Sequence, residues 1–219
     1  MAIATTINRA KYDVFRWRYE LSIPKKLALA LGMAALTGLV AQVRIPLPWT
    51  VVPITGQTFA VLLAGVLLGR RWGGISLGIY AGLGAVGLPW FAGWTGGFGV
   101  LTGATGGYII GFILAALFLG HFTDKYIRSR SFFSMFGLML FANFTLIYIP
   151  GLLWLGLWLN MIAGTPATFI TLLGMGAFPF IVGDIIKAAA AAAVARGVTP
   201  KQAYNGEVDK DKWVSWRLP

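Results

Sequence analysis

The chain has 219 residues, of which 58% are hydrophobic and only 11% are charged, and its formal net charge is +11. About a quarter of the residues in a soluble domain are charged, so this composition excludes an ordinary soluble domain and indicates a protein whose solvent is lipid. The absence of cysteine and the presence of one histidine, His121, exclude thiol catalysis, disulfides, thiolate metal sites and a histidine cluster.

The N-terminal segment, residues 1–24, is basic and rich in aromatic side chains. This mixture is typical of an amphipathic helix that lies on the anionic cytoplasmic surface of a membrane. A disordered basic arm explains the same composition equally well. No signal-peptide core is present near the start, so we expect the start of the chain to be retained.

Six apolar runs, bounded by basic residues or turn signals, predict membrane-spanning helices. Two stretches, Arg71 to Asp124 and Arg130 to Asp184, contain no charged residue between their ends, and each is long enough for two spans of about 20 residues. The runs lack the alternation that a β-barrel needs. The predicted fold is therefore an all-α integral membrane protein with six transmembrane helices. The predicted helices are Leu27–Val43, Thr55–Gly69, Trp72–Leu88, Val100–Gly120, Phe132–Ile149 and Pro179–Arg196.

Proline and glycine mark the connections between these helices. Three prolines fall in the first loop, and the third loop begins near Pro89. Because proline lacks a backbone N–H donor, Pro150-Gly151 is expected to end the fifth helix. Pro179 suits a helix start. The apolar stretch Leu152–Gly176 is expected to form a cap or re-entrant segment on the outer surface, broken at Thr165-Pro166.

The basic residues predict the orientation of the chain. Sixteen of the 18 Lys and Arg residues lie before Leu27, in the second and fourth loops, or from Arg196 to the C-terminus. The first, third and fifth loops contain only Arg44, and Lys187 lies within a helix. By the positive-inside rule both termini are cytoplasmic, and a seventh crossing would place the basic tail outside. The predicted domains are a cytoplasmic-face segment at 1–24, a six-helix membrane domain at 25–197 and a cytoplasmic tail at 198–219. The positive charge thus reports topology, and no nucleic-acid partner is expected.

Asp184 and Lys187 are the only carboxylate and the only ammonium well inside a predicted span. Each costs roughly 2.5–3.5 kcal/mol at mid-membrane, so such residues usually face a cavity or pair together. A spacing of three places both on one helical face. The pair therefore favours a ligand or ion site, although an internal ion pair that only fixes packing is the alternative.

Glycine and small residues indicate two further sites. The stretch from Gly93 to Tyr108 is dense in glycine, which can expose backbone amides to a ligand, but it lacks a phosphate-loop motif. A flexible loop is the alternative. Its aromatic residues suit an interfacial belt or a pocket wall. Ala30, Ala34 and Gly38 recur every four residues and predict close contact with a helix of this chain or of a second subunit.

Several motifs together resemble one family. They are Ile45-Pro46-Leu47-Pro48, Pro53-Ile54-Thr55-x-Gln57-Thr58, Gly96-Gly97-x-Gly99-Val100-Leu101, Thr105-Gly106-Gly107-Tyr108 and Gly183-Asp184-x-x-Lys187. Across residues 27–196 the chain resembles the BioY family, the biotin-specific substrate-binding (S) components of energy-coupling factor (ECF) transporters. Trp94 and Ala104 depart from the residues usual in that family, and the stretch from 150 to 178 is longer.

The resemblance implies a high-affinity biotin-binding subunit of a vitamin importer in the cell inner (plasma) membrane. It implies no enzymatic activity, no metal and no cofactor besides the ligand, because ATP is used by the partners only. Those partners are an energy-coupling transmembrane subunit, expected to contact Ala30, Ala34 and Gly38, and two ABC-type ATPases. The implied biotin contacts are Asp184 to the ureido N–H groups, Lys187 to an acceptor, and then Thr95, Tyr108, Gln57 and Thr55.

Two other functions compete with this expectation. A small ion or proton channel or exchanger would use the Asp184-Lys187 pair as a relay. An intramembrane enzyme is disfavoured, because the residue inventory assembles neither a catalytic dyad nor a triad.

Overall fold

The computed structural model of the protein describes residues 2–204 and 206–211, with side chains from residue 6 onward. Within these ranges the chain is helical apart from its loops and one short antiparallel hairpin, β1 (Arg44–Ile45) with β2 (Ile54–Thr55). The α-helices are α1 (Ala2–Glu20), α2 (Ile23–Ala41), α3 (Gln57–Ala85), α4 (Phe98–Leu101), α5 (Gly106–Lys125), α6 (Phe132–Phe141), α7 (Tyr148–Met161), α8 (Phe169–Gly176) and α9 (Ile181–Val198).

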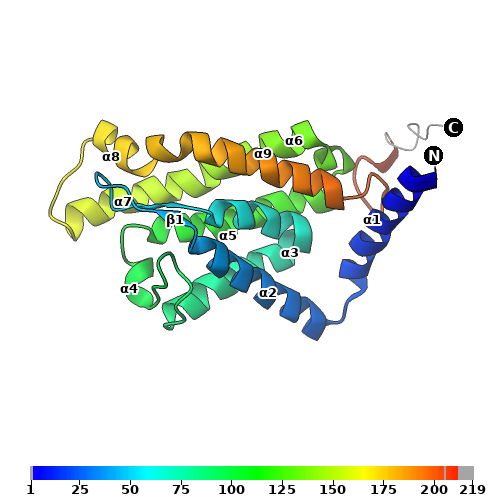
Figure 1. The fold of residues 1–219 in the computed structure, drawn as a ribbon, viewed down its shortest axis with the longest axis horizontal. Helices are drawn as coiled ribbons and strands as arrows, with labels where there is room; N and C mark the ends of the chain where they lie inside the picture. Colours follow the sequence, from blue (N-terminus) through cyan, green and yellow to red (C-terminus); the bar gives the residue numbers. More distant parts are fainter. Residues whose placement is uncertain (1, 205, 212–219) are drawn as a thin grey trace.

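Most of the long helices run along the length of the molecule, and both termini lie at one end (Figure 1). Five helical stretches of the described residues are long and apolar enough to cross a membrane. Large apolar side chains on the outside of the bundle, such as Leu39 and Val182, are exposed, as a lipid-facing surface requires. The predicted all-α membrane class is therefore confirmed. The five stretches are Ile23–Ala41, Gln57–Ala85, Gly106–Lys125, Phe132–Met161 and Phe169–Val198.

A break at Gly69 divides α3 into two halves. Gly69 has φ +80° and ψ 175°, which is a backbone conformation that favours glycine. A Cβ atom added there would lie 2.8 Å from Asp124 Oδ2, and the next backbone amide, that of Arg70, donates to the same oxygen at 2.8 Å. The second and third helices predicted from the sequence correspond to the two halves.

The prediction that the fifth helix ends at Pro150 is wrong. Helix α6 continues through a π-helical turn, η2 (Ala142–Ile147), into α7, so the helix extends to Met161. Proline lacks the amide that would bond to the preceding turn and its ring crowds that turn. The wider π turn immediately before Pro150 shifts the hydrogen-bond register there, which lets the helix pass through the proline.

The expected outer cap over Leu152–Gly176 is consequently also wrong in its first part. Residues up to Met161 belong to α7, and the connection to α8 covers residues 162–168, which include Thr165-Pro166. Helix α8 then leads through a 3-10 turn, η3 (Phe178–Phe180), into α9. Pro179 lies in the first turn of η3, as a helix start permits.

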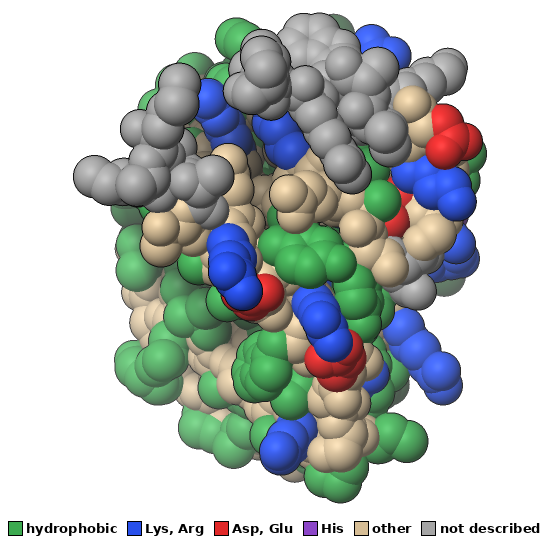
Figure 2. Space-filling view, turned by 90° about the vertical axis from the view of Figure 1, so that its right-hand side faces the viewer, with side chains coloured by type: hydrophobic (Ala, Val, Ile, Leu, Met, Phe, Trp, Pro, Cys, Tyr) green, Lys and Arg blue, Asp and Glu red, His purple; other side chains and the backbone are tan. Residues whose placement is uncertain are grey.

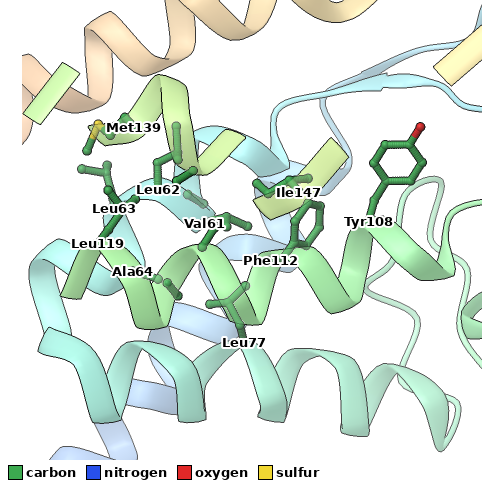
Figure 3. Packing of buried hydrophobic residues seen from close by; sticks show 14 of the residues in the cluster. Val61, Leu62, Leu63, Ala64, Leu77, Tyr108, Phe112, Leu119, Met139 and Ile147 are labelled. Carbon is green, nitrogen blue, oxygen red and sulfur yellow. The ribbon is translucent and has the colours of Figure 1, made fainter. Parts of the chain in front are cut away.

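Helices α3 and α5 pack closely at the centre of the bundle. Figure 3 shows Val61, Leu62 and Leu77 of α3 beside Phe112 and Leu119 of α5. A Cβ atom at Gly65 would lie only 2.3 Å from the carbonyl oxygen of Ala116, so the absence of a side chain there permits the two backbones to approach. Dispersion contacts between closely packed helices replace hydrophobic burial as the main stabilising contribution in lipid.

The small-residue stripe on α2 packs inside this chain. Ala30 and Ala34 have no exposed surface, and a Cβ atom at Gly38 would lie 2.7 Å from the Cβ atom of Trp90. Contact of these three residues with a partner subunit stays a prediction. The internal alternative explains the stripe because the small side chains let α2 approach α3 and the third loop.

Helix α1 docks against the end of the bundle that holds the termini. Arg18 donates to the carbonyl oxygens of Val66 (2.7 Å) and Leu67 (3.0 Å) and to Asp124 (2.6 Å), and Phe15 is buried. The disordered-arm alternative is thus wrong. The location of α1 on a cytoplasmic membrane surface stays a prediction.

The C-terminal tail packs onto the same end. Arg130, in the 3-10 turn η1 (Ile127–Arg130), is fully buried and bonds to Glu207 at 2.7 Å, and Ile127 N–H donates to Asp209 at 2.8 Å. Figure 2 looks onto this end, where Lys and Arg side chains gather around few acidic ones. Lys212 and Arg217, which the topology count includes, lie outside the described residues.

Candidate functional site

A cavity of about 250 Å³ lies toward the end of the bundle that carries the β1–β2 hairpin and α4, away from both termini (Figure 1). This volume is slightly below the range of about 300–1,000 Å³ that is typical of ligand pockets, so the cavity suits a small ligand. Its walls come from the hairpin, the third loop, α3, α5, the η2–α7 junction and the start of α9. The lining residues are Arg44, Val51, Val52, Pro53, Thr55, Gln57, Thr58, Phe91, Ala92, Thr95, Val100, Thr105, Tyr108, Ile109, Phe112, Ile147, Tyr148, Phe180, Asp184 and Lys187.

Asp184 presents a buried carboxylate to this cavity and accepts four hydrogen bonds. Oδ1 accepts from Lys187 Nζ at 2.7 Å and from Thr58 Oγ1 at 3.1 Å. Oδ2 accepts from Tyr148 Oη at 2.5 Å and from Asn143 Nδ2 at 3.0 Å. Asp184 is 3% exposed, whereas the Lys187 side chain is 19% exposed. The ion pair therefore faces a cavity, as the sequence analysis expected of a ligand site.

The π-helical turn brings two of these donors to one side of the helix. Asn143 and Tyr148 are five residues apart, and at about 100° per residue an α-helix would point them in different directions. The i→i+5 geometry of a π turn places such residues close together, and single π turns are frequent at functional sites. The turn thus serves the carboxylate as well as accommodating Pro150.

Arg44 places a second cationic group at the cavity. It lies in β1 opposite Thr55, so the hairpin positions both side chains together. Its guanidinium lies against Gly93, where a Cβ atom would be 2.3 Å from Arg44 Nη1 and where φ is +78°. The tight approach of Arg44 to the third loop therefore depends on glycine at position 93.

The third loop folds tightly over the site. Trp94 has φ +58°, an unusual conformation for a residue with a side chain, and its amide donates to Gln42 Oε1 at 2.8 Å. The Thr95 hydroxyl donates to the carbonyl of Ala92 at 3.1 Å. These local bonds hold Ala92 and Thr95 against the cavity.

All six residues predicted from the sequence line this one cavity: Asp184, Lys187, Thr95, Tyr108, Gln57 and Thr55. Several use their polar atoms on the protein itself. Tyr108 Oη donates to the carbonyl of Gly176 at 2.7 Å and so presents its ring to the cavity. Gln57 Nε2 donates to Tyr80 Oη at 2.6 Å, while Thr55 Oγ1 donates to Gln57 Oε1 at 2.9 Å.

Sequence reasoning missed Thr58, Asn143 and Tyr148 and gave Arg44 too little weight. Thr58 lay within a recognised motif, and Arg44 was the lone basic residue of the predicted outer loops, so both carried a signal. Asn143 and Tyr148 carried none, because their relation to Asp184 depends on a π turn. His121, the one histidine of the sequence, lies outside the cavity and contacts the rings of Phe122 and Tyr126.

The cavity combines apolar walls with charged groups. Phe91, Ile109, Phe112 and Phe180 supply apolar surface to the same cavity as Arg44 and the Asp184–Lys187 pair. Such a site suits an elongated ligand with hydrogen-bond donors and an acceptor at one end and a negative charge elsewhere. Among the described residues, no group of three or more His, Cys, Asp or Glu side chains has the arrangement of a metal site.

Comparisons with known proteins converge on one family. The model of the BioY family matches residues 10–203. A probable biotin transporter BioY from Methanothermobacter thermautotrophicus is 57% identical over 157 residues, which cover 72% of this chain and 100% of that protein. The biotin transporter BioY of Thermotoga maritima is 35% identical over 151 residues, or 69% of this chain and 83% of that one.

A solved structure has the same fold. The crystal structure of the S-component for biotin from an ECF-type ABC transporter superposes with a TM-score of 0.70 at 28% sequence identity. The match covers 80% of this chain and 93% of that chain.

Proposed function

The chain belongs to the BioY family, and from that premise we infer that it is the biotin-binding subunit of a vitamin importer. The observation that carries this function is the single cavity that joins Arg44 to the Asp184–Lys187 pair through apolar walls. The family is one of transporters, so the protein binds and delivers its ligand and does not convert it.

Biotin has the chemistry that this cavity accommodates. Its ureido ring offers two N–H donors beside a carbonyl acceptor, its thioether ring and alkyl chain are apolar, and it ends in a carboxylate. In the proposed pose the ureido group meets Asp184 and Lys187, and the carboxylate pairs with Arg44. Charge-assisted hydrogen bonds of this kind are about twice as strong as neutral ones. Thr95, Tyr108, Gln57 and Thr55 complete the polar and aromatic lining.

The proposed topology has six crossings with both termini in the cytoplasm. The break at Gly69 supports two crossings within α3, since Arg70 and Arg71 follow it directly and would mark the cytoplasmic turn. Residues 25–197 then form the membrane domain, with 1–24 and 198–219 on the cytoplasmic side. The cavity opens outward from the cell inner (plasma) membrane.

The proposed assembly is that of an ECF importer. An energy-coupling transmembrane subunit and two ABC-type ATPases would complete it, with ATP used by those partners only. The solved relative, an S-component of an ECF-type ABC transporter, supports this assembly. The ion or proton exchanger considered from the sequence is set aside, because the chain belongs to a family of biotin transporters.

Equilibrium titration of the purified, detergent-solubilised chain tests the proposed function. Biotin and desthiobiotin, which share the ureido group, are expected to bind, and lipoate, which lacks it, is not. Asp184→Asn is expected to weaken biotin binding about 10- to 100-fold, the value of a hydrogen bond to a charged group. Asp13→Asn, which alters an exposed carboxylate on α1, is the matched control. Absence of biotin binding, or an unchanged affinity in Asp184→Asn, would contradict the assignment.

A further inference from the structure

We propose that Tyr148 and Asn143 are positioning residues that hold one oxygen of Asp184 in place, and that Lys187 is the donor that the ligand displaces from the other oxygen. This proposal rests on the proposed function, because it concerns the same cavity. It adds to that function a reason why a urea group is selected.

Protein donors occupy every acceptor position of the Asp184 carboxylate. A carboxylate offers about four lone-pair sites, and four donors already occupy Asp184. They are Lys187 and Thr58 on Oδ1 and Tyr148 and Asn143 on Oδ2. A ligand N–H group can therefore bind only if one of these donors leaves.

Three of the donors are fixed by the packing around them. Asn143 has no exposed surface, and Tyr148 is 6% exposed, with its ring against Tyr108 (6.3 Å between centroids) and Phe144 (5.3 Å). Thr58 is 9% exposed and lies in the first turn of α3. Thr58 and Tyr148 also line the cavity, but all three side chains are at least nine-tenths buried, so moving any of them would disturb the surrounding packing.

Lys187 is the donor that is free to move. It lines the cavity, it is the most exposed of the four groups, and its ammonium sits on a flexible four-carbon stem with three rotatable donors. Once displaced, the ammonium needs another acceptor, because a buried unpaired charge is unfavourable. A ureido group supplies an N–H donor to Asp184 and an adjacent carbonyl to Lys187. The pair thus stays neutralised across the ligand.

Tyr148 and Asn143 make this exchange selective. While both donate to Oδ2, the ammonium has only Oδ1 to bind and must leave when the ligand arrives. Asn143 Oδ1 is buried with no hydrogen-bond partner among the described residues. Burying an unpaired amide oxygen is unfavourable, so the bond from Asn143 Nδ2 to Asp184 is the interaction that explains an asparagine at this position.

Titration with biotin and 2-iminobiotin tests the proposal. At neutral pH 2-iminobiotin carries a guanidinium, which offers a donor and a positive charge where biotin offers the carbonyl acceptor. The wild-type chain is expected to prefer biotin strongly, because the displaced Lys187 would face a cation. In Tyr148→Phe, Lys187 can move to the freed Oδ2 and stay bonded. Biotin affinity is then expected to fall about tenfold, the value of one hydrogen bond to a charged group, and the preference over 2-iminobiotin to shrink.

Two further variants keep the test decisive. Tyr19→Phe removes a tyrosine–aspartate hydrogen bond of 2.8 Å, to Asp124 at the opposite end of the bundle, and should change neither affinity nor preference. Asn143→Leu should act in the same direction as Tyr148→Phe and serves if the latter fails to fold. An unchanged biotin affinity, or an equal loss for both ligands, would overturn the positioning role. A wild-type chain that binds no biotin would instead overturn the proposed function.

Discussion

Single residues determine how a charged pair is accommodated in an apolar bundle. Asp184 is neutralised by Lys187 and bonded by three neutral donors, so its burial leaves no acceptor unsatisfied. A buried polar network in which every group is hydrogen-bonded is rigid, and breaking one of its bonds leaves an unpaired buried group, which is unfavourable. The cavity therefore has one rigid anionic group and two cationic groups, Lys187 and Arg44, that remain adjustable.

Arg44→Ala provides the residue-scale prediction. It is expected to weaken biotin binding about tenfold or more, since a charge-assisted pair with the ligand carboxylate is lost. Biotin methyl ester, which carries no negative charge, should bind wild type and Arg44→Ala with similar affinity in the same titration.

Arg71→Ala is the control. Arg71 is a basic residue next to the break in α3 and does not line the cavity, so its removal should leave both affinities unchanged. If Arg44→Ala bound biotin and its ester with the same preference as wild type, the carboxylate would lie elsewhere.

Among single residues, the sequence identified those whose charge is unusual in an apolar segment. Asp184 and Lys187 were visible because a charge in an apolar run is unfavourable without a partner. Asn143 was not visible in this way. A polar residue in a span is informative only when it is known which side of the helix its side chain occupies. The π turn determines that side, and no periodicity in the sequence reports it.

Among the elements, the contact between α3 and α5 determines where the cavity walls stand. Gly65 on α3 approaches the Ala116 carbonyl, and Gly120 on α5 approaches the backbone of Arg70, so the helices touch at two levels. Apolar length and basic flanks identified the helical stretches in outline, and five stretches of the described residues are long and apolar enough to cross a membrane, while the count of six crossings stays a prediction. The continuation through Pro150 was not recoverable, because compensation by a π turn is a tertiary property.

Gly65→Ala is expected to destabilise the protein by about 1–3 kcal/mol, because the added methyl group meets backbone that cannot move aside. Gly78→Ala is the matched control in the same helix, where a Cβ atom meets nothing within 4 Å. Its expected effect is neutral or a stabilisation of up to about 1 kcal/mol from helix propensity. Thermal unfolding in detergent measures both, and equal melting temperatures for the two variants would contradict the close-contact explanation.

In the whole molecule, α1 and the C-terminal tail close one end while the cavity occupies the other. The tail is held by a buried ion pair between Arg130 and Glu207. Burial raises the pKa of Glu207, but hydrogen bonds from Arg130 and from backbone amides outweigh this and hold the pKa below its usual value. A carboxyl with a lowered pKa stabilises the fold above its ordinary pKa, and this contribution is lost as the pH falls below it.

The tail is therefore expected to undock below about pH 4, under the ordinary glutamate pKa. Glu207→Gln should loosen it already at pH 7, because removing one partner of a buried pair costs about 3–5 kcal/mol. Hydrogen exchange of the Val208 amide, which donates to the Lys125 carbonyl, reports the docking. Asp13→Asn changes an exposed carboxylate on α1 that is not part of this ion pair and should have little effect; faster Val208 exchange there would contradict this assignment.

The proposed orientation has a direct test, because the chain contains no cysteine to give background labelling. Thr165→Cys, in the exposed loop before α8, should react with a membrane-impermeant maleimide in intact cells. Lys201→Cys, near the docked tail, should react only after permeabilisation. The reverse pattern would invert the topology and place the cavity opening on the cytoplasmic side.

The docking of α1 has a consequence for the order of biosynthesis. Arg18 leaves the ribosome early, yet the carbonyl of Val66 lies 48 residues later in the chain and Asp124 lies 106 residues later. Both must be translated before this arginine can bond to them, and translation proceeds at about 5–20 residues per second. Helix α1 therefore waits for several seconds beside a partly inserted chain and takes its final position only after α5 has been completed.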